Sequence, residues 1–508
     1  MRYLTVLLVS VLMLTGLGYV SPISAADKPV SQQDRKWLDI RAANRKGREG
    51  MYAGAAADRV DRAKKASAIL LDLIKAAEKM RVPGQDAAFA DMIGFIGRLD
   101  PTQVEPMKSA VKGLPPEPTM ADEKVAKTWT RTYDSKRSAF TKPTEILGQK
   151  ALDLGVTDIA FDCLQQVLKF DPDNASLRKA LNQTKVDERY YGPKDMIFVK
   201  AGLRWDKKLG WIVGKDAARY EAGDYFDIQT KKWTTLAEAN TMRSNAAEQW
   251  IIQTEHLEIR GTATLQQLVD AANHLEAFYA QVFANYSLFF SKGKNDIKLI
   301  FGLLDHPRLV LNIAKDPEAY KASVPPSVPG WSAGVWIPAN GASYFYAGPL
   351  MVMFHEFTHQ ILDIFSSGSG AKVWVVEGVA VYTQSPIYEN GELKLGDISK
   401  NGHIQGHLRR VLSGGAMTLE QLMRLNHESW SKSPDPSVQY GAAGTLAQFC
   451  MEANDRRYRS DYVEFVRDEY LGQSGGHEIW DYLGMTRDEF TSNYKAWEKD
   501  MAEKVKKD

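Results

Sequence analysis

Two histidines and one glutamate in this chain have the spacing of a metal site. Residues 355–359 read His-Glu-Phe-Thr-His. On a helix, positions i and i+4 lie on one face, so the imidazoles of His355 and His359 point the same way and can share one ion. Glu377 follows in an apolar segment, where a carboxylate is costly unless it binds a cation or a hydrogen-bond donor. These three residues are the predicted metal ligands.

The predicted ion is Zn²⁺. Two imidazoles and a carboxylate leave a fourth tetrahedral position open for water, which is typical of a catalytic rather than a structural zinc site. Glu356 stands beside the first ligand and is the predicted general base for that water. The pattern therefore predicts zinc-dependent hydrolysis of peptide bonds. The alternative is an accidental motif, with the two histidines at the surface or hydrogen-bonded in the core.

The residues around the motif predict two helices. Pro349 suits a first helical turn, because its missing N–H is unpaired there anyway. Five apolar residues then recur at helical spacing: Leu350, Phe354, Phe357, Ile361 and Ile364. The turn residues 366–370 are expected to end this helix. The apolar stretch 373–382 predicts a second helix, in which Gly378 would allow close approach of a neighbouring helix.

Residues 355–382 resemble the gluzincin metallopeptidases, in which the third ligand is a Glu on the helix after His-Glu-x-x-His. More widely, residues 205–500 resemble exported peptidase-MA-like proteins, through segments 211–225 and 250–261, the metal helix and Trp374–Tyr382. The resemblance implies a zincin-like domain with a small sheet ahead of the metal helix. An edge strand of that sheet would pair with extended substrate backbone. Gly334, Val335 and Trp336 are the predicted edge; the alternative is an ordinary hairpin.

The same resemblance suggests a role for Tyr440, in the segment 439–449 that is expected to open a helix. In the aminopeptidase branch of the gluzincins, a Tyr in a similar place donates a hydrogen bond to the developing oxyanion. The alternative is a packed Tyr with its hydroxyl in water. The aminopeptidase Gly-Ala-Met-Glu-Asn motif is absent from the sequence. Its absence counts against that specificity and leaves endo- and exopeptidase action open.

Three further residues have weaker claims. His403 and His407 are also four apart, but Ile404 replaces the Glu, so surface residues or substrate contacts are expected rather than a second metal site. Asp363, four residues after His359, could orient a ligand imidazole or lie exposed on the helix.

Residues 1–26 read as a secretory signal, with Arg2, an apolar stretch at 4–20 and small residues at 24–26. The alternative is a membrane anchor. The expectation is an exported protein, periplasmic or extracellular, that is soluble after signal removal. The chain has 64 Lys and Arg against 63 Asp and Glu, a balance that gives no support to nucleic acid or an anionic membrane as partner. Cys163 and Cys450 could form a disulfide or stay as buried thiols.

The chain is long enough for two or three domains, and the predicted class is α+β. Helical spacing dominates residues 27–192, where 147–174 fit the register of one tetratricopeptide-like repeat. This region is either a partner-binding module or a plain helical hairpin, and 113–118 is its expected linker. A small β-rich connector is expected at 193–249 and the metallopeptidase domain at 250–508. The remaining alternative is a catalytically silent zinc-binding exported protein that holds a partner through its helical region.

Five elements are expected ahead of the metal helix, followed by a mostly helical C-terminal part. They are a strand at 251–259, a helix at 264–286, a strand at 297–303, and two short strands at 332–337 and 343–346.

Overall fold

The computed structural model of the chain describes residues 32–80, 85–112, 123–291, 295–366, 370–389 and 392–507. The predicted secretory signal and the predicted linker at 113–118 lie outside these residues. The described chain forms two compact units and is α+β, as predicted. One unit contains residues 43–181 and 295–301, and the other contains 32–42, 182–291 and 302–507. The predicted domain boundaries stay predictions.

The first unit is helical. Its elements are α1 (Gln32–Met80, of which 43–80 belong here), α2 (Gln85–Leu99), η1 (Pro101–Gln103), α3 (Val104–Lys112), α4 (Glu123–Asp153), α5 (Thr157–Phe170), α6 (Ala175–Ala180) and α11 (Ile297–Ile300). The rings of Phe95, Phe140 and Phe170 pack against one another in its core. The repeat-like segment forms the α4–α5 hairpin, in which a Cβ on Gly148 would lie 3.0 Å from the side chain of Leu164. A partner-binding module and a plain helical hairpin would both contain this pair of helices, so the hairpin does not decide between them.

After residue 181 the second unit continues with three small hairpins. Their elements are β1 (Thr184–Val186), β2 (Arg189–Tyr191), α7 (Met196–Lys200), β3 (Leu203–Asp206), β4 (Gly210–Val213), η2 (Gly214–Asp216), α8 (Ala217–Glu221), β5 (Asp224–Asp227), β6 (Lys232–Thr235) and α9 (Leu236–Met242). The hairpins β3–β4 and β5–β6 lie within 193–249, the segment that was predicted to be rich in β-structure. Aromatic side chains hold them together, as where the guanidinium of Arg219 covers the ring of Trp233 at 3.7 Å.

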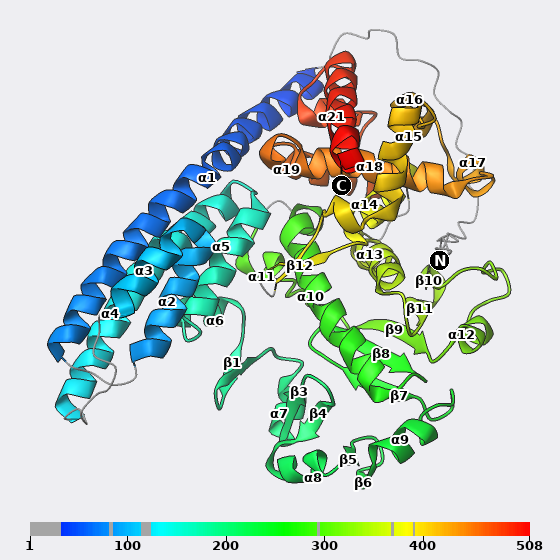
Figure 1. Ribbon diagram of the computed structural model, residues 1–508. Coiled ribbons are helices and arrows are strands. Elements are labelled where there is room, and N and C mark those ends of the chain that lie inside the picture. Colours follow the sequence, from blue (N-terminus) through cyan, green and yellow to red (C-terminus); the bar gives the residue numbers. More distant parts are fainter. Residues whose placement is uncertain are drawn as a thin grey trace. The chain divides into compact units, whose positions relative to one another are not determined.

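A five-stranded mixed sheet follows, in the order β10-β11-β9-β8-β7 (Figure 1). The strands are β7 (Trp250–Gln253), β8 (Leu257–Gly261), β9 (Leu309–Ala314), β10 (Gly334–Ile337) and β11 (Ala342–Tyr346), with η3 (Pro338–Asn340) before β11. β9 is parallel to both β8 and β11, whereas the two outer pairs are antiparallel. The predicted strands near 332–337 and 343–346 are confirmed as β10 and β11.

Two predictions in this region are wrong. The single strand at 251–259 is the hairpin β7–β8, whose turn is held by Glu276: this carboxylate accepts hydrogen bonds from the hydroxyl of Thr254 and the backbone N–H of His256. The strand at 297–303 is the short helix α11, because the side chain of Asp296 caps its first turn. The third strand of the sheet is β9, which was not predicted.

Helices cover the sheet and complete the unit. α10 (Leu265–Phe290) and α13 (Leu350–Ser366) pack together through the stacked rings of Phe278 and Phe354, 4.6 Å apart. The remaining elements are α12 (Pro317–Ser323), α14 (Val373–Thr383), β12 (Ile387–Glu389), β13 (Glu392–Lys394), η4 (Ile398–Lys400), α15 (Gly402–Ser413), α16 (Leu419–Met423), α17 (His427–Ser431), α18 (Pro436–Arg456), α19 (Arg459–Tyr470), α20 (Ile479–Leu483) and α21 (Arg487–Lys507).

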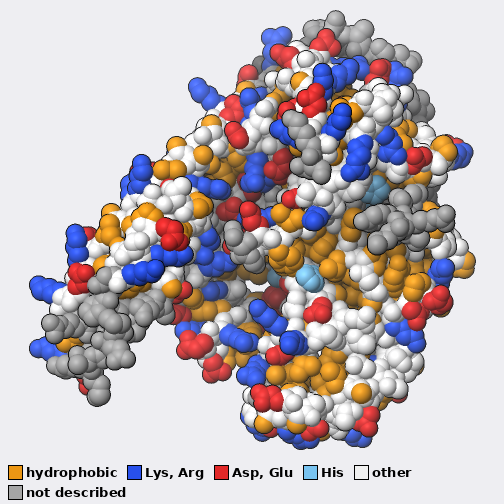
Figure 2. Space-filling model, viewed as in Figure 1, with side chains coloured by type: hydrophobic (Ala, Val, Ile, Leu, Met, Phe, Trp, Pro, Cys, Tyr) orange, Lys and Arg blue, Asp and Glu red, His pale blue; other side chains and the backbone are white. Residues whose placement is uncertain are grey.

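The described surface and interior bear on three further expectations. Basic and acidic side chains are interspersed over the face drawn in Figure 2. None of the described helices is both long and apolar enough to cross a bilayer. Cys163 and Cys450 are buried free thiols, which is the second of the two expected states.

Candidate metal centre

The His-Glu-x-x-His motif lies in the middle of α13, and Glu377 lies in α14, as predicted. The two helices are joined near the motif by a hydrogen bond of 2.8 Å between the hydroxyls of Thr358 and Thr383. On its other side, α13 is fixed to the sheet by Gln360, which accepts a hydrogen bond from Ser343 in β11 and donates one to the carbonyl of Val310 in β9. These contacts fix the height and rotation of α13, so that both histidines face α14.

Three ligand atoms form a nearly equilateral triangle. The Nε2 atoms of His355 and His359 are 3.1 Å apart, and Oε2 of Glu377 lies 3.3 Å and 3.5 Å from them. Bonds of about 2.0–2.1 Å at tetrahedral angles place neighbouring ligand atoms roughly 3.3 Å apart, so the triangle fits one small divalent ion. Among the described residues, this is the group of His, Cys, Asp and Glu side chains that could hold a metal ion. All three are buried, at 0–2 % exposure.

Gln384, which was not predicted, orients the first ligand. Its Oε1 lies 2.9 Å from Nδ1 of His355, and it is fully buried at the C-terminal end of α14. An amide oxygen can only accept, so Nδ1 carries the proton and Nε2 keeps its lone pair for an ion. Gln384 follows Glu377 by seven residues and therefore shares its helix face. That spacing was the signal from which the sequence could have predicted Gln384.

The charges of the triad are strongly coupled. Burial disfavours ionisation of Glu377, but the two imidazoles outweigh this effect and bring its pKa down to about 2. Burial likewise disfavours the imidazolium of His359, but the Glu377 carboxylate raises the pKa of His359 to about 9. The Glu377 carboxylate therefore favours a positive charge at the two imidazoles, which a proton or a metal ion could supply.

Glu356 is fully buried and is held by the sheet edge. Its Oε2 accepts a hydrogen bond of 2.9 Å from the backbone N–H of Trp336. Burial raises the pKa of Glu356, against the effects of the two imidazoles and this amide. Asp363 does not bond to His359 and is not exposed: it accepts a hydrogen bond of 2.7 Å from the indole of Trp336. It thus fixes the residue whose amide holds Glu356.

The predicted substrate strand is β10, an edge strand of the sheet. Packing explains why residue 334 is a glycine, since a Cβ there would lie 2.6 Å from side-chain atoms of both Phe345 and Val352. Part of the edge is already in use. The Gly334 carbonyl accepts a hydrogen bond from the hydroxyl of Ser332, and the Trp336 amide donates to Glu356. Val335 is buried in the same strand.

Tyr440 lies in the second turn of α18, with its ring centroid 6.0 Å from that of His355. The structure therefore brings it next to the first ligand. His403 and His407 are not surface residues, since α15 packs against α18 and α21. His403 faces Tyr440 at 5.6 Å between ring centroids, and His407 pairs with Glu498 at 2.8 Å.

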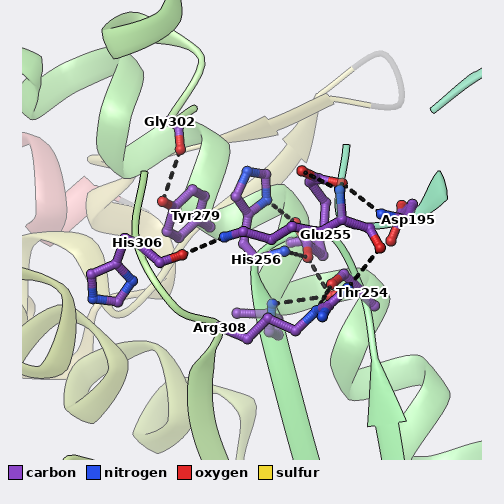
Figure 3. Close-up of polar contacts among 11 residues, drawn as sticks. Asp195, Thr254, Glu255, His256, Tyr279, Gly302, His306 and Arg308 are labelled. Atoms are coloured by element: carbon purple, nitrogen blue, oxygen red, sulfur yellow. Dashed lines mark hydrogen bonds and ion pairs between the residues drawn. The ribbon is translucent and has the colours of Figure 1, made fainter. Parts of the chain in front are cut away.

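A second polar cluster lies around the turn between β7 and β8 (Figure 3). The Glu255 carboxylate accepts hydrogen bonds from the backbone N–H groups of Lys194 and Asp195, and Arg308 donates to the carbonyl of Lys194. His256 pairs with Glu276 at 2.7 Å. The cluster clamps the segment ahead of α7 onto the sheet. Burial, together with Glu255 and Glu276, raises the pKa of Asp195 to about 7.

Comparison of the chain with protein-family models, with curated proteins and with solved structures finds no match, so the assignment of this centre depends on its geometry.

Proposed function

We propose that this chain is a zinc-dependent peptidase, with His355, His359 and Glu377 as ligands and Glu356 as general base. The observation that carries the proposal is the triangle of ligand atoms, whose sides of 3.1, 3.3 and 3.5 Å suit a tetrahedral ion with one position to spare. Two imidazoles and one carboxylate form a ligand set that zinc accepts well. The resemblance to gluzincins, the zincin-like layout and export belong to the same proposal.

Bound zinc would supply positive charge that polarises a carbonyl and makes water acidic near neutral pH. Glu356 removes a proton from the attacking water and passes it to the leaving amine. Its burial supports this cycle, because a carboxyl with a raised pKa holds a proton more readily than an exposed one. The hydrogen bond from the Trp336 amide fixes the orientation of the Glu356 carboxylate.

The substrate would lie along β10 and below Tyr440. An extended peptide pairs with free backbone groups of a sheet edge. In this chain a substrate and Glu356 would both need the backbone N–H of Trp336. Tyr440 is the proposed oxyanion donor, a contribution that can reach about 3 kcal/mol. His403 stands beside Tyr440 and lines the same side of the centre.

The test is Glu356→Gln in the full chain. The variant keeps the shape of the side chain and all three ligands, so it should retain about one zinc per chain by elemental analysis. Cleavage of a broad peptide library should fall by roughly 10²–10⁴-fold, because a proton acceptor has been removed. Glu318→Gln, in α12, is the matched control. Full activity of Glu356→Gln would rule out the general-base role.

One observation favours a second candidate, a zinc-binding protein that does not cut. The side chains of His355, Glu356, His359 and Glu377 are all at most 2 % exposed. A buried ion of this kind could stabilise the fold alone. The two candidates separate when the zinc-loaded chain is incubated with the library: a peptidase gives cleavage that a chelator stops, and a structural site gives bound zinc and intact peptides.

A further inference from the structure

The helical unit contains a groove that is separate from the metal centre. It lies between α1 on one side and α4 and α5 on the other, with a volume of about 560 Å³. Ligand pockets typically span about 300–1,000 Å³. All lining residues fall within 46–166 and so belong to a single unit.

Gly47, Gly50 and Gly54 of α1 line one side of the groove and form its glycine floor. Gly47 has a packing reason, because a Cβ there would lie 3.0 Å from the side chain of Leu154. Gly50 and Gly54 have none, since a Cβ on either would meet no atom within 4 Å. Glycine weakens a helix interior. The contacts of the described residues therefore do not explain these two positions, and both leave room for a ligand backbone to lie close to α1.

Basic side chains outnumber acidic ones around this floor. Lys46, Arg59 and Lys150 line the groove and make no ion pair with any described residue. Arg62 differs, since Asp58 neutralises it at 2.6 Å and Thr144 accepts a second hydrogen bond from it. Two acidic residues also line the groove, Asp58 and Asp162, so four basic side chains face two carboxylates and the lining has an excess of positive charge.

One buried acceptor also lines the groove. Oε1 of Gln166 is shielded from solvent and has no hydrogen-bond partner among the described residues. A buried acceptor without a donor is destabilising, so a ligand that brings an N–H group would be favoured once the Gln166 side chain turns toward the groove. An alkyl chain lacks such a group, whereas each residue of a peptide other than proline has one.

The spacing of the charges sets the length of the ligand. Lys46 and Arg59 are thirteen positions apart on α1, which is about 20 Å along a helix. Six steps of an extended peptide also span roughly 20 Å. We infer that this groove binds an extended peptide with acidic side chains about six residues apart, whose backbone lies on the glycine floor and donates to Gln166. This inference does not depend on hydrolysis at the metal centre.

The probe is a seven-residue peptide with aspartate at both ends, alanine and leucine between them, and a neutral coumarin label. Its binding to the full chain carrying Glu356→Gln, which prevents cleavage, is measured by fluorescence anisotropy. We expect saturable binding that weakens as salt is raised. The same peptide with asparagine in place of aspartate should bind at least about tenfold more weakly. Equal binding of the two peptides overturns the inference.

Two variants locate the site. Lys46→Glu combined with Lys150→Glu should weaken binding at least about tenfold, whereas the exposed Lys64→Glu on the same helix should not. Gly54→Leu fills the groove and replaces glycine by a better helix former, so it should lose binding while the thermal midpoint Tm stays equal or rises. A folded Gly54→Leu protein that binds the peptide normally would place the site elsewhere and sink the proposal.

Discussion

Gln384 is a neutral residue that determines which nitrogen of His355 can reach a metal. Gln384→Leu removes the acceptor for Nδ1 and allows the ring to turn or change tautomer. We expect zinc affinity to fall by about 10–100-fold, as for other residues that hold a metal ligand. Competition with a chelating dye measures the affinity. Gln384→Glu keeps an acceptor at the same place and should retain most of it, and equal affinity of all three proteins would exclude the positioning role.

Asp195 links pH to stability. Its pKa is about 7 in the folded chain and near 3.9 when unfolded, because of burial and the nearby Glu255 and Glu276. Between these values the folded state binds more protons, so stability falls as pH rises from about 4 to 7. Asp195→Asn cannot ionise and should be more stable than the parent chain at pH 8, on the order of 1–3 kcal/mol.

Urea unfolding of the two proteins at several pH values tests this prediction. The difference between Asp195→Asn and the parent chain should shrink to near zero at about pH 4, where Asp195 is protonated in both states. A difference that does not change with pH would mean that another interaction of Asp195 is responsible.

At the residue scale, sequence spacing was enough to pair His355 with His359, because i and i+4 on a helix is a local relation, and Glu377 was found from its apolar surroundings and from the resemblance to gluzincins. The partners of the triad were out of reach. Trp336 meets Glu356 across twenty positions, and Asp363 turns to Trp336 instead of His359. Such contacts depend on how β10 lies against α13, and nothing local determines that.

At the element scale, replacing glycine by alanine is expected to have opposite effects on stability at two positions. A Cβ on Gly378 in α14 would lie 2.8 Å from the backbone carbonyl of Ala443 in α18. Gly378→Ala should therefore destabilise the chain by about 1–3 kcal/mol. Gly94 in α2 has no neighbour within 4 Å of such an atom, so Gly94→Ala should stabilise it by about 0.5–1 kcal/mol. Chemical denaturation measures both, and a common sign would contradict the close α14–α18 contact.

Elements with a long apolar period were predictable, as α10, α13, α14 and α18 show. The short segments near residue 300 were not. Ile297–Ile300 has the composition of a strand, but the cap from Asp296 makes it a helix. Leu309–Ala314 alternates inward and outward and forms β9, yet its identity depends on pairing with β8 and β11, which are distant in sequence.

At the scale of the whole molecule, metal removal should act on one unit only. An ion that binds the native state at about 1,000 times its Kd stabilises that state by roughly 4 kcal/mol. Chelation should therefore speed amide hydrogen exchange in α13 and α14 and leave α2 and α5 unchanged, as measured by mass spectrometry of peptic fragments. Equal acceleration in both units would mean that they unfold as one.

The helical unit is discontinuous along the gene. Residues 295–301 return to it from within the other unit, and there Phe301 meets Phe161 at 4.9 Å between ring centroids, while Asn295 donates to the carbonyl of Leu152. A fragment that stops at residue 181 would lose the segment 295–301 and expose Phe161. Recombination that moves the helical half into another protein must therefore carry two separate stretches of coding sequence.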